Sequence, residues 1–219
     1  MSTFSIKEAF SYGWGALKKN FWFLVGVFAI IVVVSGIFSA ISQYATDHSV
    51  VWLSVAVQIA SVVVQTIFTI GSTRIALRIY NQQETSIKEL FLEDGKFWSY
   101  IVATILYLLI VLAGLILLIV PGIVWALKYQ FYPWLIVEKN MKGKEAFKTS
   151  GVITKGNKGK LFLFWLATAG VCIVGFIIVG IGIIPAAALV FMANTFVYKK
   201  LSAQLETTQS SQTPPQTTL

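Results

Sequence analysis

The sequence predicts an all-α fold, a polytopic six-helix transmembrane bundle built from three units that each join an interfacial amphipathic helix to a transmembrane hairpin. Composition supports this prediction, because 57% of the 219 residues are hydrophobic and only 12% are charged. The apolar residues also gather in segments long enough to cross about 30 Å of hydrocarbon at about 1.5 Å per residue. Finally, all but one of the 17 basic residues fall on one side of the alternating apolar segments.

The lengths of the apolar stretches predict six spans. Two stretches near the N-terminus are each long enough to cross the bilayer alone. Two later stretches are too long for one helix, and each has a proline near its middle, Pro121 beside Gly122 in the first and Pro185 in the second. We expect these prolines in the first turn of a second helix, where the missing N–H costs nothing. The predicted spans are 21–41, 51–73, 97–119, 121–137, 161–184 and 185–198.

The basic residues predict the orientation, since cytoplasmic loops are enriched in Lys and Arg. Basic residues precede the first span, separate spans two and three, separate spans four and five, and follow the sixth, whereas the opposite turns contain none. The sequence therefore predicts a multi-pass protein of the plasma (inner) membrane with both termini cytoplasmic. Residues 1–200 form a single predicted transmembrane domain, and the polar segment 201–219 is predicted to be a disordered cytoplasmic tail.

The net charge of +8 favours anionic lipid headgroups as partners and disfavours nucleic acid. The reason is that the basic residues lie at helix ends, beside the membrane surface. Seven lysines between Lys139 and Lys160 separate spans four and five, and we predict a membrane-surface basic loop there. An acidic partner, a second copy of the chain or another membrane protein are alternative partners. The residues of the predicted loop are Lys142, Lys144, Lys148, Lys155, Lys158 and Lys160.

A short motif recurs before each predicted hairpin. The segment 4–10 (FSIKEAF) is repeated at 85–91 (TSIKELF) and, in shortened form, at 144–147 (KEAF). The first two copies contain Ser-x-x-Glu, which is typical of a capping box at a helix N-terminus. The first copy begins an apolar stripe that ends at Leu17, which predicts an amphipathic helix lying on the membrane. The alternative is that so short a match arose by chance.

Three further segments stand out, 121–134 (PGIVWALKYQFYPW), 145–150 (EAFKTS) and 154–157 (TKGN). Together they resemble the YciC-like group of bacterial inner-membrane proteins. They are also similar to the membrane domain attached to some glycerophosphoryl diester phosphodiesterases. The resemblance implies a multi-pass plasma-membrane protein and no particular reaction, because the catalytic domain of those fusion proteins has no counterpart in this chain.

Lys128 is the one basic residue outside the charge pattern. The sequence places it inside the hydrocarbon, which costs about 2.5 to 3.5 kcal/mol on insertion scales. One hypothesis is that Lys128 and several amides line a polar path, beside a helix kink at Pro133. The alternative, which the absence of an intramembrane acid favours, is that Lys128 extends to the outer headgroups while the amides bond neighbouring helices. The candidate intramembrane polar site is Lys128, Gln130, Gln58, Gln65 and Asn194.

The sequence predicts no catalytic, cofactor-binding or metal-binding site. The single histidine, His48, lies beside Asp47 in an outer turn, and two residues do not make a metal site. The single cysteine, Cys172, is expected to be a packing residue. Our first hypothesis is therefore a protein that is not an enzyme and that organises or assists lipid or protein components of the membrane. The alternative is a small transporter or carrier with a polar site around Lys128.

Overall fold

The computed structural model describes residues 4–92, 94–177 and 182–210, and all regular elements in these ranges are helices. The all-α prediction is therefore confirmed. The elements in order are α1 (Ile6–Lys19), α2 (Phe21–Asp47), α3 (Val51–Tyr80), η1 (Ile87–Phe91), α4 (Phe97–Leu117), α5 (Ile119–Tyr129), α6 (Tyr132–Lys139), α7 (Gly143–Ile153), α8 (Lys158–Ile177) and α9 (Ile183–Ser210). Four of the described helices, α2, α3, α4 and α8, are long and apolar enough to cross a membrane.

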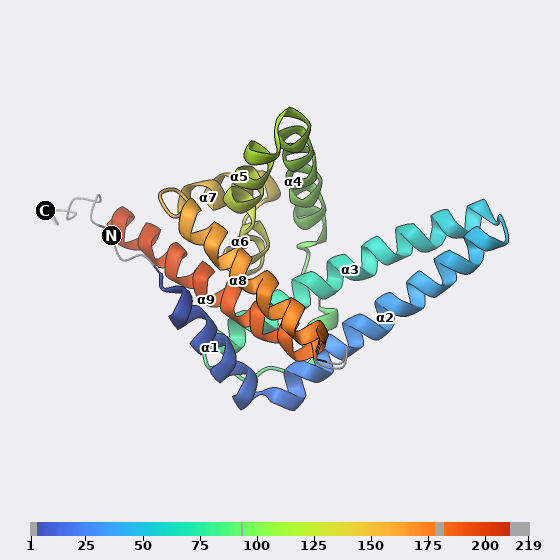
Figure 1. Cartoon of the computed structure of the whole chain (residues 1–219), viewed down its shortest axis with the longest axis horizontal. Helices are drawn as coiled ribbons and strands as arrows, with labels where there is room; N and C mark the ends of the chain where they lie inside the picture. The colour runs from blue at the N-terminus through green and yellow to red at the C-terminus, as the bar shows by residue number, and fades with distance from the viewer. Residues whose placement is uncertain (1–3, 93, 178–181, 211–219) are drawn as a thin grey trace, which may run out of the picture.

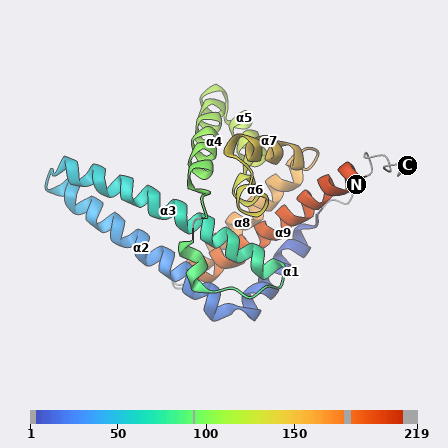
Figure 2. The ribbon, with the colours of Figure 1, turned by 180° about the vertical axis from the view of Figure 1, so that it is seen from behind.

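Three helical hairpins diverge from a common base (Figure 1). In this view α2 and α3 form a long hairpin that reaches to the right, α4 and α5 form a second that points upward, and α8 and α9 pack together through the centre. Seen from behind, the inner end of α3 crosses the same centre and packs on α6 and α9 (Figure 2). The core therefore lies in the base, where the inner ends of the helices meet.

The predicted spans and the observed helices differ in the second and third hairpins. The predicted span 121–137 is replaced by two shorter helices, α5 and α6, and neither is among the four spanning candidates. The predicted span 185–198 lies within α9, which is not among them either. Part of the predicted span 161–184, residues 178–181, lies outside the described residues. By length and apolarity the described helices thus support four crossings, where the sequence predicted six.

The break between α5 and α6 comes just before Phe131, close to the predicted kink at Pro133. Pro133 lies in the first turn of α6, where its missing N–H is tolerated. Hydroxyl groups of α7 replace backbone bonds at the break. The Phe131 N–H donates to Ser150 Oγ at 3.2 Å, and Thr154 Oγ1 donates to the Lys128 carbonyl at 2.9 Å. The break is therefore fixed by contacts with α7, which satisfy buried backbone groups.

The last helix, α9, runs through the centre of the molecule and ends at Ser210, so it continues past the predicted start of the tail at residue 201. The prediction of a disordered tail from that position is corrected accordingly, and residues 211–219 lie outside the described part. A helix surrounded by protein needs less apolar sequence than one that faces lipid, because neighbouring helices cover its polar positions. Fully buried side chains of α9 include Met192, Val197, Tyr198 and Leu201.

The three copies of the repeated motif do not share one structure. The first copy begins α1, the second forms the short 3-10 helix η1, and the third begins α7. Neither Ser5 nor Ser86 makes the side-chain hydrogen bond of a capping box. Glu89 instead pairs with Arg78 at 2.8 Å. The motif therefore marks the same position before each hairpin without imposing one conformation on it.

Each of these segments packs on a hairpin other than the one that follows it, α1 on α9, η1 on α3, and α7 on α4 and α6. The buried face of α1 consists of Ala9, Gly13 and Leu17. Its approach to α9 is so close that a Cβ added at Gly13 would lie 2.7 Å from the Leu189 carbonyl oxygen. Protein therefore covers this face of α1, where the sequence predicted a helix lying on the membrane.

Candidate functional site

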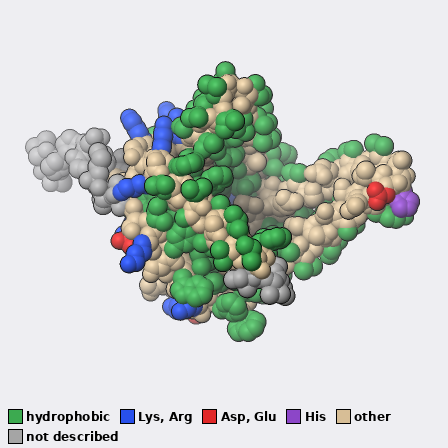
Figure 3. Space-filling model, viewed as in Figure 1, with side chains coloured by type: hydrophobic (Ala, Val, Ile, Leu, Met, Phe, Trp, Pro, Cys, Tyr) green, Lys and Arg blue, Asp and Glu red, His purple; other side chains and the backbone are tan. Residues whose placement is uncertain are grey.

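A basic surface is formed by α7, the turn that follows it and the start of α8. All six lysines of the predicted loop are exposed there. Figure 3 shows blue side chains gathered at the upper left, over this end of the molecule. We call this group the basic surface, and its members are Lys142, Lys144, Lys148, Lys155, Lys158 and Lys160.

The orientation of the basic surface is fixed because the opposite face of α7 is buried against α4 and α6. The Phe147 ring stacks on the Tyr129 ring, with centroids 3.9 Å apart. At the start of α7, a Cβ added at Gly143 would lie 2.5 Å from the Ser99 carbonyl oxygen, so the two helices touch through their backbones. The buried residues of α7 are Gly143, Ala146, Phe147, Ser150 and Ile153.

Lys128 lies in the last turn of α5 and is partly buried beside α7. Its Nζ lies 4.8 Å from the centroid of the Tyr129 ring, a cation–π contact. Its Cε would lie only 3.0 Å from a Cβ added at Gly151 of α7. Lys128 is therefore a neighbour of the helix that carries the basic surface.

The other residues of the candidate polar site lie in different parts of the fold. Gln130 donates to the Leu127 carbonyl at 3.2 Å and borders a cavity of about 170 Å³. Gln58 and Gln65 border a separate groove of about 540 Å³ between α2 and α3. Asn194 donates to the Val190 carbonyl of its own helix at 2.9 Å. The described part of the structure does not bring these amides and Lys128 together around one cavity.

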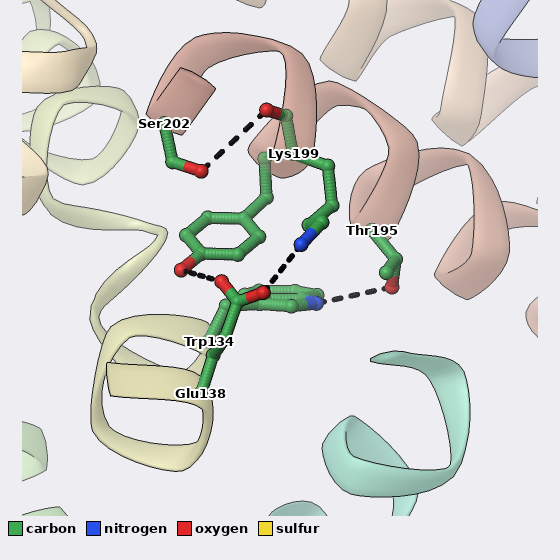
Figure 4. A network of polar contacts seen from close by, with 6 residues as sticks. Trp134, Glu138, Thr195, Lys199 and Ser202 are labelled. Carbon is green, nitrogen blue, oxygen red and sulfur yellow. Dashed lines mark hydrogen bonds and ion pairs between the residues drawn. The ribbon is translucent and has the colours of Figure 1, made fainter. Parts of the chain in front are cut away.

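A polar network joins α6 to α9 in the core (Figure 4). The Tyr198 hydroxyl donates to the Glu138 carboxylate at 2.5 Å, and Lys199 Nζ pairs with the same carboxylate at 2.5 Å. The Trp134 indole N–H donates to Thr195 Oγ1 at 3.0 Å. Sequence analysis missed this network because the partners are 60 or 61 positions apart. The one available signal was an isolated acid, Glu138, at the inner end of an apolar segment.

Two arginines at the inner end of α3 form ion pairs with the segment that leads to α4. Arg74 pairs with Asp94 at 2.6 Å, and Arg78 pairs with Glu89 at 2.8 Å. The Arg74 side chain is only 10% exposed, so this pair is part of the packed base. The sequence predicts a solvated charged loop at Glu93 and Asp94; Asp94 is indeed 53% exposed although it pairs with Arg74, and Glu93 lies outside the described residues.

The outer tip of the α2–α3 hairpin carries the single histidine. His48 Nδ1 lies 2.9 Å from the Tyr44 carbonyl oxygen, and the two rings stack with centroids 4.1 Å apart. Across residues 4–92, 94–177 and 182–210, no three His, Cys, Asp or Glu side chains gather in a way that could hold a metal ion. Both contacts of His48 are with Tyr44, one turn earlier in the same helix.

No family model matches the chain, and neither a curated protein nor a solved structure matches it. The resemblance to the YciC-like group stays a prediction from the sequence. Any assignment of function therefore depends on the residues of the chain itself, and the basic surface is the feature on which sequence and structure converge.

Proposed function

We propose that this chain is a YciC-like multi-pass protein of the plasma membrane that organises or assists lipid or protein components without catalysing a reaction. In this proposal the basic surface faces the cytoplasm and binds anionic headgroups, and both termini lie on the same side. The observation that carries the proposal is six exposed lysines on one continuous segment, formed by α7, the turn after it and the start of α8.

The burial of the apolar face of α7 distinguishes this surface from an ordinary amphipathic membrane anchor. An anchor inserts its apolar face into lipid, whereas the apolar face of α7 is already buried in protein. The lysines must then act through charge alone. A basic residue near an anionic leaflet contributes about 1 kcal/mol, and this attraction is screened by salt. A fixed array of lysines therefore favours a patch of anionic lipid beneath it.

The surroundings of Lys128 also support this orientation. The sequence alone made Lys128 an exception within the hydrocarbon, but its side chain lies along α7, beside Gly151. If α7 lies at the cytoplasmic surface, Lys128 lies near that surface too. All 17 basic residues of the chain would then obey the positive-inside rule.

A carrier is the weaker candidate. A carrier of polar cargo needs polar groups that converge on one site near the middle of the membrane. Asn194 is instead bonded within its own helix, and Gln58 and Gln65 border a groove that Lys128 does not line. The organising role is thus better supported than transport.

The test is a comparison of two variants with equal loss of charge, reconstituted in bilayers of phosphatidylcholine and phosphatidylglycerol. The first variant neutralises four lysines of the basic surface, and the second neutralises four exposed lysines elsewhere. Native mass spectrometry after gentle extraction gives the ratio of anionic to neutral lipid that stays bound. The substitutions to Gln are at Lys144, Lys148, Lys155 and Lys158 in the first variant, and at Lys7, Lys18, Lys88 and Lys200 in the control.

We expect the ratio to fall about tenfold in the first variant and to change much less in the control, since only the first removes a clustered charge. The effect should weaken as salt concentration rises. Equal ratios in the two variants, or a loss independent of salt, would overturn the proposed role of the basic surface.

A further inference from the structure

A hollow of about 700 Å³ lies where α1 meets α2, below the inner end of α3. The connector from α3 to η1, which runs along the bottom of the molecule in Figure 2, contributes Gln82, Gln83, Glu84 and Thr85 to its lining. Its lining mixes apolar and aromatic side chains with polar and charged ones. The lining residues that matter for its chemistry are Tyr12, Lys19, Phe23, Tyr80, Glu84 and Thr85.

If α2 crosses the bilayer as proposed, the hollow lies at the level of the headgroup layer. The spanning candidate α2 begins at Phe21, beside the hollow. Two tryptophans near this helix junction are strongly exposed, Trp14 at 51% and Trp22 at 84%. Exposed tryptophans at the end of a span are typical of the membrane–water interface. A lipid headgroup is therefore the kind of molecule that the hollow meets.

Two opposite charges line the hollow without pairing. Lys19 and Glu84 are both exposed in its lining, and no ion pair between them exists in the described part of the chain. The connector that carries Glu84 is held in place, because Arg78 Nη1 donates to the Glu84 carbonyl at 3.3 Å and the Gln83 N–H donates to the Arg78 carbonyl at 2.9 Å. A hollow lined by two opposite charges that do not pair with each other suits a zwitterion.

Neutral hydrogen-bonding groups are also available inside the hollow. Burial, with a further contribution from nearby Tyr80, raises the pKa of Tyr12 to about 12, so its hydroxyl stays protonated at physiological pH. Thr85 Oγ1 is buried and has no hydrogen-bond partner among the described residues. Buried polar atoms are nearly always bonded to protein, water or a ligand. Thr85 therefore indicates a polar occupant.

We infer that this hollow binds the headgroup of a zwitterionic aminophospholipid, with its phosphate at Lys19 and its ammonium at Glu84. The phosphate also lies near the N-terminal turn of α2, whose N-cap residue Asn20 makes no side-chain cap bond. A primary ammonium can donate three hydrogen bonds to the carboxylate and neighbouring oxygens, whereas a choline group has no N–H to donate. The inference goes beyond the proposed function because it involves none of the lysines of the basic surface.

The experiment measures which lipid the full-length protein retains from bilayers that contain phosphatidylethanolamine, phosphatidylcholine and phosphatidylglycerol in equal amounts. Native mass spectrometry should detect one tightly held phosphatidylethanolamine per chain. Glu84→Gln should lower its preference over phosphatidylcholine about tenfold, since the carboxylate is lost. Lys19→Gln should lower the retention of both zwitterionic lipids, because their phosphates are alike.

Matched controls are available on α1 itself. Lys18→Gln and Glu8→Gln make the same charge changes at exposed positions that do not line the hollow, and they should leave the retained lipid unchanged. Soluble phosphoethanolamine distinguishes a lipid from a free headgroup, and it should not displace the bound lipid at millimolar concentration. Equal effects of the test and control variants, no preference for phosphatidylethanolamine, or displacement by the soluble compound would each overturn the inference. Neither variant of the basic-surface experiment changes a residue that lines the hollow, so the two proposals can fail separately.

Discussion

At the residue scale, Glu138 connects two helices that are far apart in the sequence. Its carboxylate contacts the Tyr198 hydroxyl and the Lys199 ammonium, both at 2.5 Å. The side chains of Glu138 and Lys199 are 19% and 23% exposed, so water screens the pair only partly. Removing one partner would leave the other charge partly buried without compensation, which is the costly outcome for such pairs.

We therefore expect Glu138→Gln to destabilise the protein by about 1 to 3 kcal/mol, the usual range for a lost bond to a charged, partly buried group. Thermal unfolding in detergent, followed by circular dichroism, measures the change. Glu145→Gln is the matched control. Because Glu145 is exposed on α7, this variant should have the melting temperature of the wild type. Equal melting temperatures for the two variants would show that the ion pair contributes nothing to stability.

A second prediction at the residue scale concerns Lys128. Its side chain lies over the Tyr129 ring and beside Gly151, and its carbonyl accepts a bond from Thr154. Lys128→Leu should therefore leave the set of bound molecules unchanged in native mass spectrometry, apart from a small decrease in anionic lipid. A small molecule bound in stoichiometric amount to the wild type and lost in this variant would favour the carrier instead.

At the element scale, the close contact between α1 and α9 depends on Gly13. A Cβ at this position would lie 2.7 Å from the Leu189 carbonyl oxygen, whereas a Cβ at Gly15 would meet nothing within 4 Å. Gly13→Ala should lower stability because a backbone atom of α9 has to move. Gly15→Ala should be neutral or raise stability by up to about 1 kcal/mol, since alanine favours the helix. Thermal unfolding of the two variants should therefore shift in opposite directions or differ clearly, and identical shifts would refute this account of the contact.

The sequence predicted the long apolar helices well. It predicted poorly the helices whose ends depend on packing against other parts of the chain. The helices α2, α3, α4 and α8 begin close to the predicted spans, because long apolar runs identify helices that face lipid. α6 and α9 departed from prediction because much of their surface is covered by other protein, and α5 because it ends at the break before α6. Their lengths depend on contacts such as the bond between the Phe131 N–H and Ser150 Oγ, which joins residues 19 positions apart.

The candidate sites show the same difference between features that residue type determines and features that tertiary contacts determine. Charged residues stay at the surface unless paired, so exposure of the six lysines of the basic surface follows from their type and spacing. An amide carries no such constraint, because it can bond within its own helix, as Asn194 does with Val190. The hollow beside α1 could not be predicted, since Lys19 and Glu84 are brought to it by the fold.

At the scale of the whole molecule, a charged base is combined with hairpins that are apolar on the outside. Large side chains on the spanning candidates remain exposed, for example Val33 at 60%, Leu109 at 59% and Ile173 at 60%. Contiguous apolar surface of this kind is stable in lipid or against another membrane helix, and it promotes aggregation in water. The arginine pairs instead lie in the base, at the inner end of α3, so charge and exposed apolar surface occupy different parts of the α2–α3 hairpin.

The most direct test of this account is to determine on which side of the membrane the basic surface lies. The single cysteine allows it, because Cys172→Ser gives a chain without thiols. Lys148→Cys and His48→Cys, made separately in that chain, place one thiol on α7 and one at the outer tip, where both native residues are exposed. Labelling with a membrane-impermeant maleimide then compares intact and opened cells. We expect the thiol at position 48 to react in intact cells and the thiol at position 148 only after opening; the reverse pattern, or reaction of both in intact cells, would contradict the account.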